Sequence, residues 1–291
     1  MWGLFVLFYC RFNQRCGSTG FTGGILLAVE TDGPAYMGKP PSPNILFDKY
    51  NVTWHFLYKW QWSDTPWKLH PHKYMKYDLM TKWCKQLPPK TAVVFADVRD
   101  TYFQSNPVLP MATMAYEADL HLYKEHRKNT IGSDKTNGNW IKDCFGEEFF
   151  TTVKNNAIIC SGAMIGTAFG MGNLGAKVLT EINSRLDDQK CRDFDQRYVM
   201  FLFYKGRLQR EDGVYPAMGV KLWDMMAPQA AVAHLGLCPK AVIKYDDKHR
   251  ILNQDSGLVP IVHQYDRKQV DKTYPRRWCV GMLARMDYCK K

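Results

Sequence analysis

The feature that most constrains the fold is an apolar run that ends in charge. Residues 91–97 read TAVVFAD, and the chain continues VRDTYFQSNP, so that Asp97 and Asp100 follow directly after the run. A continuous apolar run is typical of a strand buried on both faces in the middle of a sheet. In open α/β sheets, ligands bind outside the carboxyl ends of such strands. The sequence therefore predicts a central strand with a site at its end.

Strand and helix patterns alternate around this run. We expect strands at 24–30, 51–58, 118–126 and 157–167, the third of them more exposed, and helices at 73–87, 174–186 and 195–204. The apolar start, residues 1–10, is far shorter than the ~20 residues that span a bilayer and is expected to form an edge strand. The alternation favours a single α/β domain over 1–291, with a mostly parallel central sheet flanked by helices.

Charge and cysteine usage restrict the partners. A net charge of +11 favours anionic partners such as a phosphate-bearing substrate. The basic residues are dispersed and no nucleic-acid-binding motif accompanies them, so we expect no nucleic acid and no stable membrane span. Most of the nine cysteines are expected to be buried thiols, with a Cys279–Cys289 disulfide as an option in an oxidising lumen. The compartment stays open between the cytoplasm and a Golgi or ER lumen, if a membrane anchor was lost.

Asp97 and Asp100 have the chemistry of a cation site. Two carboxylates at one strand end are hard oxygen ligands, which Mg²⁺ or Mn²⁺ accepts while keeping positions for substrate phosphates. The chain has no G-x-x-x-x-G-K-[ST] motif, which excludes a P-loop enzyme. The other reading of the same residues is structural: one aspartate caps the next helix, and Asp100 pairs with Arg99 at the surface.

Four segments resemble GT-A-fold glycosyltransferases. FADVRDTYFQSNP (95–107) resembles the D-x-D region of that family, and CSGAMIGT (160–167) resembles its glycine-containing strand. DFDQRYVMFLFY (193–204) resembles its acceptor-side helix start, and PIVHQYDRK (260–268) resembles its late histidine segment. The segments occur in the family's order between about residues 24 and 268. The closest likeness is to retaining galactosyltransferase and glycogenin-like members.

The resemblance implies a fold and a reaction. It implies a Rossmann-like GT-A domain, with a nucleotide-binding half at about 1–110 and an acceptor-binding half at about 111–291. Such an enzyme moves a sugar from a nucleotide-diphosphate donor, most often a UDP-sugar, to a hydroxyl of a glycan, protein or lipid. Mn²⁺ or Mg²⁺ is the implied cofactor.

The resemblance also implies roles for individual residues. The implied metal ligands are Asp97, Asp100 and His263, and the implied catalytic pair is Asp195 and Gln196. The implied donor-binding residues are Thr31, Asp97, Arg99, Ser161, Gly162, Arg267 and Lys268. Arg99 stands where a strict D-x-D has its second acid, so either Asp100 ligates through a shifted turn or Arg99 touches phosphate. An inverting enzyme would instead need a carboxylate base, for which Asp193, Asp195 and Asp224 are candidates.

Two other functions remain open at this point. GMGNLG (170–175) matches the G-x-G-x-x-G fingerprint of dinucleotide-binding folds and suggests an NAD(P)-dependent oxidoreductase. A non-catalytic nucleotide-sugar-binding protein is the other alternative. Purely structural roles also remain open: His263 can be a core histidine, and Asp195 can cap a helix.

Overall fold

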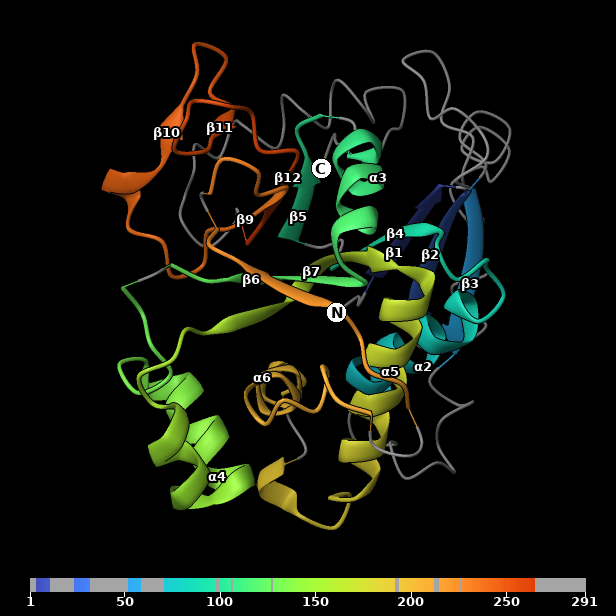
Figure 1. Ribbon diagram of the computed structural model, residues 1–291, viewed down its shortest axis with the longest axis vertical. Coiled ribbons are helices and arrows are strands. Elements are labelled where there is room, and N and C mark those ends of the chain that lie inside the picture. Colours follow the sequence, from blue (N-terminus) through green and yellow to red (C-terminus); the bar gives the residue numbers. More distant parts are fainter. Residues whose placement is uncertain are drawn as a thin grey trace.

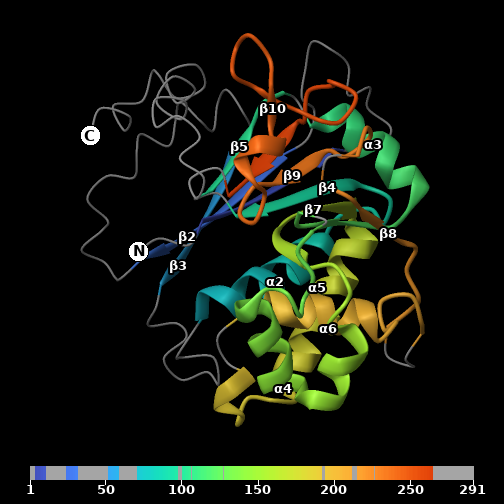
Figure 2. The same cartoon turned by 90° about the vertical axis from the view of Figure 1, so that its left-hand side faces the viewer.

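The protein has a mixed α/β fold built on one seven-stranded sheet (Figures 1 and 2). The computed structural model describes residues 4–10, 24–31, 52–58 and 71–264, apart from 98–99, 106, 127, 192–193, 212–214 and 226. The main sheet has the order β3 (Val52–Tyr58), β2 (Gly24–Thr31), β1 (Leu4–Cys10), β4 (Ala92–Asp97), β7 (Ile159–Thr167), β6 (Leu120–Lys124) and β8 (Val220–Trp223). The helices are α2 (Pro71–Cys84), α3 (Val108–Glu117), α4 (Lys135–Val153), α5 (Ala168–Asn183) and α6 (Gln196–Tyr204).

A second, smaller sheet lies over one face of the main sheet. It contains β5 (Thr101–Phe103), β12 (Ile261–His263) and β9 (Val232–His234), with β12 in the middle. A hairpin of β10 (Lys244–Tyr245) and β11 (Ile251–Leu252) lies beside it. Helix α3 covers the same face of the main sheet, and α2, α4, α5 and α6 lie on the opposite face (Figure 1).

The prediction of a mostly parallel sheet is wrong. Strands β2 and β3 are parallel, as are β6 and β8, whereas β1 is antiparallel to both β2 and β4. Strand β7 is likewise antiparallel to both β4 and β6. Because these two reversed strands separate the others, antiparallel pairs predominate although β2, β3, β4, β6 and β8 all run the same way. The reversal cannot be read from composition, since a buried strand is apolar in either direction.

Most predicted elements form, with three corrections. The N-terminal strand β1 lies between β2 and β4, not at the sheet edge. Strand β6 was expected to be exposed, but its first four residues are buried because β7 and β8 flank it and both faces are covered. Helix α5 begins at Ala168, six residues earlier than expected, because the Thr167 hydroxyl caps it by accepting a hydrogen bond from the Gly170 N–H.

Strand β4 shows why the run TAVVFAD is continuously apolar. Val93 and Phe95 pack in the core shared with α2, α5 and α6, and Val94 and Ala96 pack in the core shared with α3, β9 and β12. Both faces of the strand are therefore buried, as its sequence predicts. Its last residue, Asp97, lies beyond both cores, at the carboxyl end of the strand.

The glycines of GMGNLG serve close packing inside α5. A Cβ on Gly170 would overlap the backbone carbonyl of Asp119, and one on Gly175 would lie 2.8 Å from the Tyr77 carbonyl oxygen on α2. The dinucleotide fingerprint needs a parallel strand–helix–strand unit, but β7, which precedes α5, is antiparallel to both of its neighbours. Packing accounts for the motif here, and its surroundings do not favour the oxidoreductase alternative.

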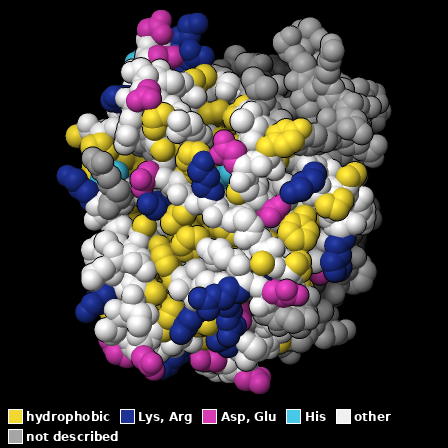
Figure 3. Space-filling model, viewed as in Figure 1, with side chains coloured by type: hydrophobic (Ala, Val, Ile, Leu, Met, Phe, Trp, Pro, Cys, Tyr) yellow, Lys and Arg dark blue, Asp and Glu magenta, His cyan; other side chains and the backbone are white. Residues whose placement is uncertain are grey.

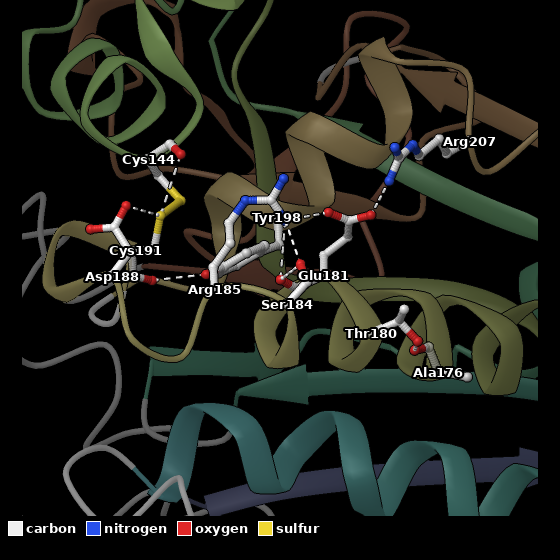
Figure 4. A network of polar contacts seen from close by, with 10 residues as sticks. All are labelled: Cys144, Ala176, Thr180, Glu181, Ser184, Arg185, Asp188, Cys191, Tyr198 and Arg207. Atoms are coloured by element: carbon white, nitrogen blue, oxygen red, sulfur yellow. Dashed lines mark hydrogen bonds and ion pairs between the residues drawn. A yellow bond between two sulfur atoms is a disulfide. The ribbon is translucent and has the colours of Figure 1, made fainter.

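A polar network and a disulfide hold the helices on the α5 side (Figure 4). Buried Glu181 of α5 accepts from Arg185 at 2.5 Å and also from Arg207. Cys144 of α4 forms a disulfide with Cys191, which lies shortly before α6. The sequence did not indicate this pair. Cys84, Cys160 and Cys238 are buried thiols, as most of the cysteines were expected to be. The Cys279–Cys289 option lies outside the described residues.

The surface of the described region shows mixed charge. On the face seen in Figure 3, Lys and Arg side chains are scattered and interleaved with acidic and hydrophobic ones. Among the described residues, no helix combines the length and apolar character that a membrane crossing requires.

Replacing Gly170 by Ala is expected to destabilise the protein by about 2 kcal/mol, because the new Cβ meets a backbone oxygen that no side-chain rotation can remove. Gly172→Ala is the matched control: its Cβ would meet only the Cys84 Cβ at 3.2 Å, and alanine favours a helix interior. Urea unfolding measures both free energies. Equal stabilities of the two variants would contradict the packing described for Gly170.

The double variant Cys144→Ser/Cys191→Ser is expected to lose about 2–4 kcal/mol of unfolding free energy under oxidising conditions, because the bond closes a long loop in the unfolded chain. The loss should vanish when both proteins are measured with reductant. Peptide mapping of the unreduced parent provides the direct check, and a map without a linked Cys144–Cys191 pair would rule out the bond.

Candidate functional site

The register of the main sheet creates the candidate site at the end of β4. Ala96 pairs with Ala163 across β4 and β7, which places Gly162 beside Asp97. In the small sheet, His263 of β12 pairs with Thr101 of β5 and with His234 of β9. Segments distant in sequence thus meet at one sheet edge, with the end of β4 in the middle.

The three predicted metal ligands lie together. His263 Nε2 is 3.3 Å from Asp100 Oδ1. A Cβ on Gly162 would overlap the His263 imidazole and would lie 3.1 Å from Asp97 Oδ2, so the imidazole and this carboxylate both lie against the glycine. This arrangement joins two carboxylates at the end of β4 to an imidazole nitrogen at the end of β12, far along the chain.

Asp97 has an incompletely satisfied carboxylate. Its Oδ1 is buried and has no hydrogen-bond partner in the described part of the chain, although Lys76 Nζ lies 3.8 Å away. About a third of the side chain (32%) is nevertheless exposed. Burial, partly offset by Lys76 and His263, raises the pKa of Asp97 to about 6. The other oxygen, Oδ2, lies toward Gly162 and the His263 imidazole, and a carboxylate oxygen there suits a hard divalent cation.

Lys76 of α2 is a member of the site that sequence reasoning missed. Its side chain is 4% exposed and forms an ion pair with Asp195, whose other contact from α2 is the Tyr77 hydroxyl at 2.8 Å. Burial lowers the pKa of Lys76, but Asp195 and Asp97 outweigh that effect and raise it overall. The available signal was position: Lys76 precedes Met80 by four residues and so lies on the apolar face of its helix.

The Asp195 carboxylate also lies at the site, where neighbouring side chains hold it in place. It stands at the start of α6 but makes no capping hydrogen bond, so the helix-cap reading is wrong. Burial works to raise the pKa of Asp195, yet the charge of Lys76 and hydrogen bonds from Lys76, Tyr77 and Ser161 bring it below its usual value. Asp195 is therefore an ionised, oriented hydrogen-bond acceptor beside Asp97.

Gln196 and Gly162 are placed differently from what the sequence suggested. The Gln196 amide donates to Glu125 at 3.3 Å and to Asn137 at 3.0 Å, so it binds the residue that follows β6 and a residue of α4. Gly162 was expected to lie under a sugar ring, but the His263 imidazole occupies that space. The glycine permits a close approach, and the approaching group in this structure is a side chain.

Several predicted residues cannot be compared with the structure. Arg99, Arg267, Lys268 and Asp193 lie outside the described residues. Thr31 is the last residue of β2. Because Phe5 of β1 pairs with Ala28 on one side and with Asp97 on the other, Thr31 lies near the same sheet edge as Asp97.

A second group of potential ligands adjoins His263. His263 Nδ1 lies 2.9 Å from His234 Nδ1 and 3.5 Å from Cys160 Sγ, and all three residues are buried. Sequence reasoning missed His234, and it included Cys160 only as the first residue of the segment that resembles the family's glycine-containing strand. His234 sits in the short apolar stretch AVAH, where nothing in the sequence distinguishes it from a core histidine.

Asp224 lies at a separate cavity beyond the ends of β6 and β8. This cavity has a volume of about 380 Å³, and its lining is His126, Lys128, Asp224, Met225, Val242, Lys244, Asn253 and Gln254. Asp224 is 53% exposed and pairs with Lys124 at 3.1 Å. Because β6 and β8 are parallel to each other and run in the direction of β4, the cavity opens at the same edge of the sheet as Asp97.

The groups gathered at this edge define its chemistry. Three carboxylates, an ammonium group and an imidazole can bind a cation, orient hydroxyl groups and hold protons at defined atoms. No protein-family model matches the chain, and a search of curated proteins found no match.

Lys76→Met is expected to cost about 3 kcal/mol of unfolding free energy, because it leaves the Asp195 carboxylate buried without its counter-ion. Adding Asp195→Asn should recover part of the loss, and chemical unfolding of the single and double variants measures the coupling. Lys82→Met on the same helix is the control, since its pair with Asp78 is mostly exposed on the lysine side and should matter by less than about 1 kcal/mol. If Lys76→Met is as stable as Lys82→Met, the Lys76–Asp195 ion pair does not make this contribution to the free energy of unfolding.

Proposed function

We propose that the chain is a divalent-metal-dependent glycosyltransferase with a GT-A-like fold. It would move a sugar from a nucleotide-diphosphate donor, with UDP-sugar as the preferred class, to a hydroxyl of a glycan, glycoprotein or glycolipid. The observation that carries the proposal is the meeting of Asp97 and Asp100 with His263. Carboxylate oxygens of two aspartates beside one imidazole nitrogen form a donor set that fits Mn²⁺ or Mg²⁺.

The proposed ligands are Asp97, Asp100 and His263 Nε2. The chemistry that the cation supplies when bound is neutralisation of the diphosphate charge as the sugar leaves. The chain contains D-V-R-D where a strict D-x-D would stand, so Asp100 acts from one residue further along. Its position 3.3 Å from His263 favours the shifted-turn reading over a purely structural role.

Asp195 is the residue we assign to the sugar. Lys76 and Tyr77 hold its carboxylate ionised and fixed, which suits an acceptor of hydrogen bonds from sugar hydroxyls. The geometry favours the retaining reading, in which Asp195 orients the donor, because a base must take up a proton and Lys76 opposes that. Gln196 then acts indirectly, by tying the start of α6 to Glu125 and Asn137.

The cavity beyond β6 and β8 is the proposed acceptor site. Its polar side chains, among them Asp224, Asn253 and Gln254, are of the kind that hydrogen-bond hydroxyl groups. It opens at the sheet edge that carries Asp97, so a donor and an acceptor would approach from the same side of the sheet. Asp224 is exposed and paired with a lysine there, which suits acceptor contact more than activation of a nucleophile.

Thermal-shift measurements with UDP, GDP and NADH, each with and without Mn²⁺, test the ligand class. We expect UDP or GDP to stabilise the protein only when Mn²⁺ is present, because the cation joins the carboxylates to the diphosphate. Stabilisation by NADH alone would instead support the oxidoreductase. Metal-dependent donor binding without hydrolysis or transfer would support the non-catalytic binding protein.

Substitutions in the parent enzyme test the assigned ligands. Asp97→Asn and His263→Ala should each lower metal-dependent hydrolysis of the nucleotide-sugar donor at least about 100-fold, since one lost group that stabilises developing charge costs about that much. Asp247→Asn, an exposed aspartate of the β10–β11 hairpin, is the matched control and should keep the parent rate. Circular dichroism confirms folding of each variant. A variant of Asp97 or His263 with the parent rate removes that residue from the proposed site.

A further inference from the structure

Cys160, His234 and His263 form a second cluster of metal-ligating side chains. They come from three strands: Cys160 follows the first residue of β7, and the histidines end β9 and β12. The three residues are at most 2% exposed, and one ligand atom from each lies within 4.8 Å of the others. The proposed donor site uses Nε2 of His263, so it does not explain why Cys160 and His234 lie against Nδ1.

The donor atoms suit a soft divalent cation. Thiolate and imidazole ligands select Zn²⁺ over the hard cations that carboxylates prefer. Tetrahedral Zn²⁺, with bonds of about 2.3 Å to sulfur and about 2.05 Å to nitrogen, separates sulfur from nitrogen by about 3.6 Å and two nitrogens by about 3.3 Å. The corresponding distances here are 3.5 Å and 2.9 Å. These two distances are within a few tenths of an ångström of that geometry, and all three ligand atoms lie within 4.8 Å of one another.

Hydrogen bonding alone leaves the cluster poorly satisfied. The two Nδ1 atoms can share one proton, but His234 Nε2 is buried without a hydrogen-bond partner among the described residues. A buried polar atom without a hydrogen-bond partner is unfavourable. Val232 and Ile261, which share a strand face with His234 and His263 respectively, belong to an apolar core, where a polar trio has no packing advantage.

His263 separates two kinds of donor set. Its Nε2 faces Asp100 and the oxygen donors of β4, whereas its Nδ1 faces Cys160 and His234. A neutral imidazole has one lone pair, so coordination through Nδ1 leaves the proton on Nε2, where it can donate to Asp100. Only one side of the ring can then serve a cation at a time.

We propose that Cys160, His234 and His263 bind a soft divalent cation of the Zn²⁺ class, at a site distinct from the hard-cation site at Asp97 and Asp100. On binding, the Cys160 thiol gives its proton to solvent and its sulfur forms a bond to the cation, while both imidazoles ligate as neutral groups. An occupied soft site takes the His263 lone pair away from the hard site. Zn²⁺ should therefore weaken the Mn²⁺-dependent binding of nucleotide.

The experiment uses the full chain, stripped of metal and titrated with Co²⁺ as a spectroscopic stand-in for Zn²⁺. We expect a thiolate-to-Co²⁺ charge-transfer band in the near ultraviolet, which Zn²⁺ bleaches by displacement. Cys160→Ser should abolish the band, and His234→Gln should weaken Co²⁺ binding at least about 10-fold, the lower bound for loss of a ligand or its support. Cys84→Ser, at another buried thiol, is the control and should leave the band intact.

Further measurements separate this site from the proposed enzyme site. Asp100→Asn should keep the Co²⁺ band while it loses Mn²⁺-dependent donor hydrolysis, so either proposal can fail without the other. If Cys160→Ser does not fold, protection of Cys160 from alkylation by Zn²⁺ in the parent replaces it, read by mass spectrometry. No charge-transfer band in the folded parent, a band that survives in Cys160→Ser, or alkylation unaffected by Zn²⁺ would each overturn the soft site.

Discussion

The confinement of negative charge at the end of β4 is the constraint on which the rest of the structure depends. Asp97, Asp100 and Asp195 converge where strands from distant parts of the chain end. Carboxylates that lie close together repel one another. Lys76 and His263 lie against these carboxylates, and the Tyr77 and Ser161 side chains donate hydrogen bonds to Asp195. Helix α2 and strand β12, which pack on opposite faces of the main sheet, each supply one of the first two groups.

Close backbone approach makes that convergence possible. Gly162 admits the His263 imidazole against β7, and Gly170 and Gly175 let α5 approach the β6 end and α2 closely enough to bring Lys76 under Phe95. Each of these positions excludes even a methyl group. Glycine in this protein serves side-chain and helix contacts, which is also why a motif typical of dinucleotide binding appears without the strand arrangement it needs.

The imidazole of His263 links two environments of different hardness. Its Nε2 side is lined by carboxylates and its Nδ1 side by sulfur and a second imidazole. Burial holds the pKa of His234 well below its usual value, which keeps that ring neutral and able to act as a ligand. The chemistry of the site thus depends on which side of one ring carries the proton.

The sequence by itself determined the type of most strands of the main sheet and of helices α2, α5 and α6, the central burial of TAVVFAD and the presence of carboxylates at its end. Local pattern carries that information, because burial on both faces requires an uninterrupted apolar run and a strand end in such a sheet is where charge is tolerated. The sequence also indicated Asp97, Asp100, Asp195 and His263 as candidate site residues, and the structure brings them together at the carboxyl end of β4.

Only the tertiary structure decided strand direction, the central place of β1 and the partners of each charge. A strand pattern is the same whether the chain runs forward or backward, so the reversal of β1 and β7 had no local signal. Lys76, His234 and Cys160 lie at the site because of contacts between elements far apart in the chain. Such contacts produce no spacing pattern in the sequence. Local patterns report whether a residue is buried, whereas the identity of its neighbour is set by the packing of the whole chain.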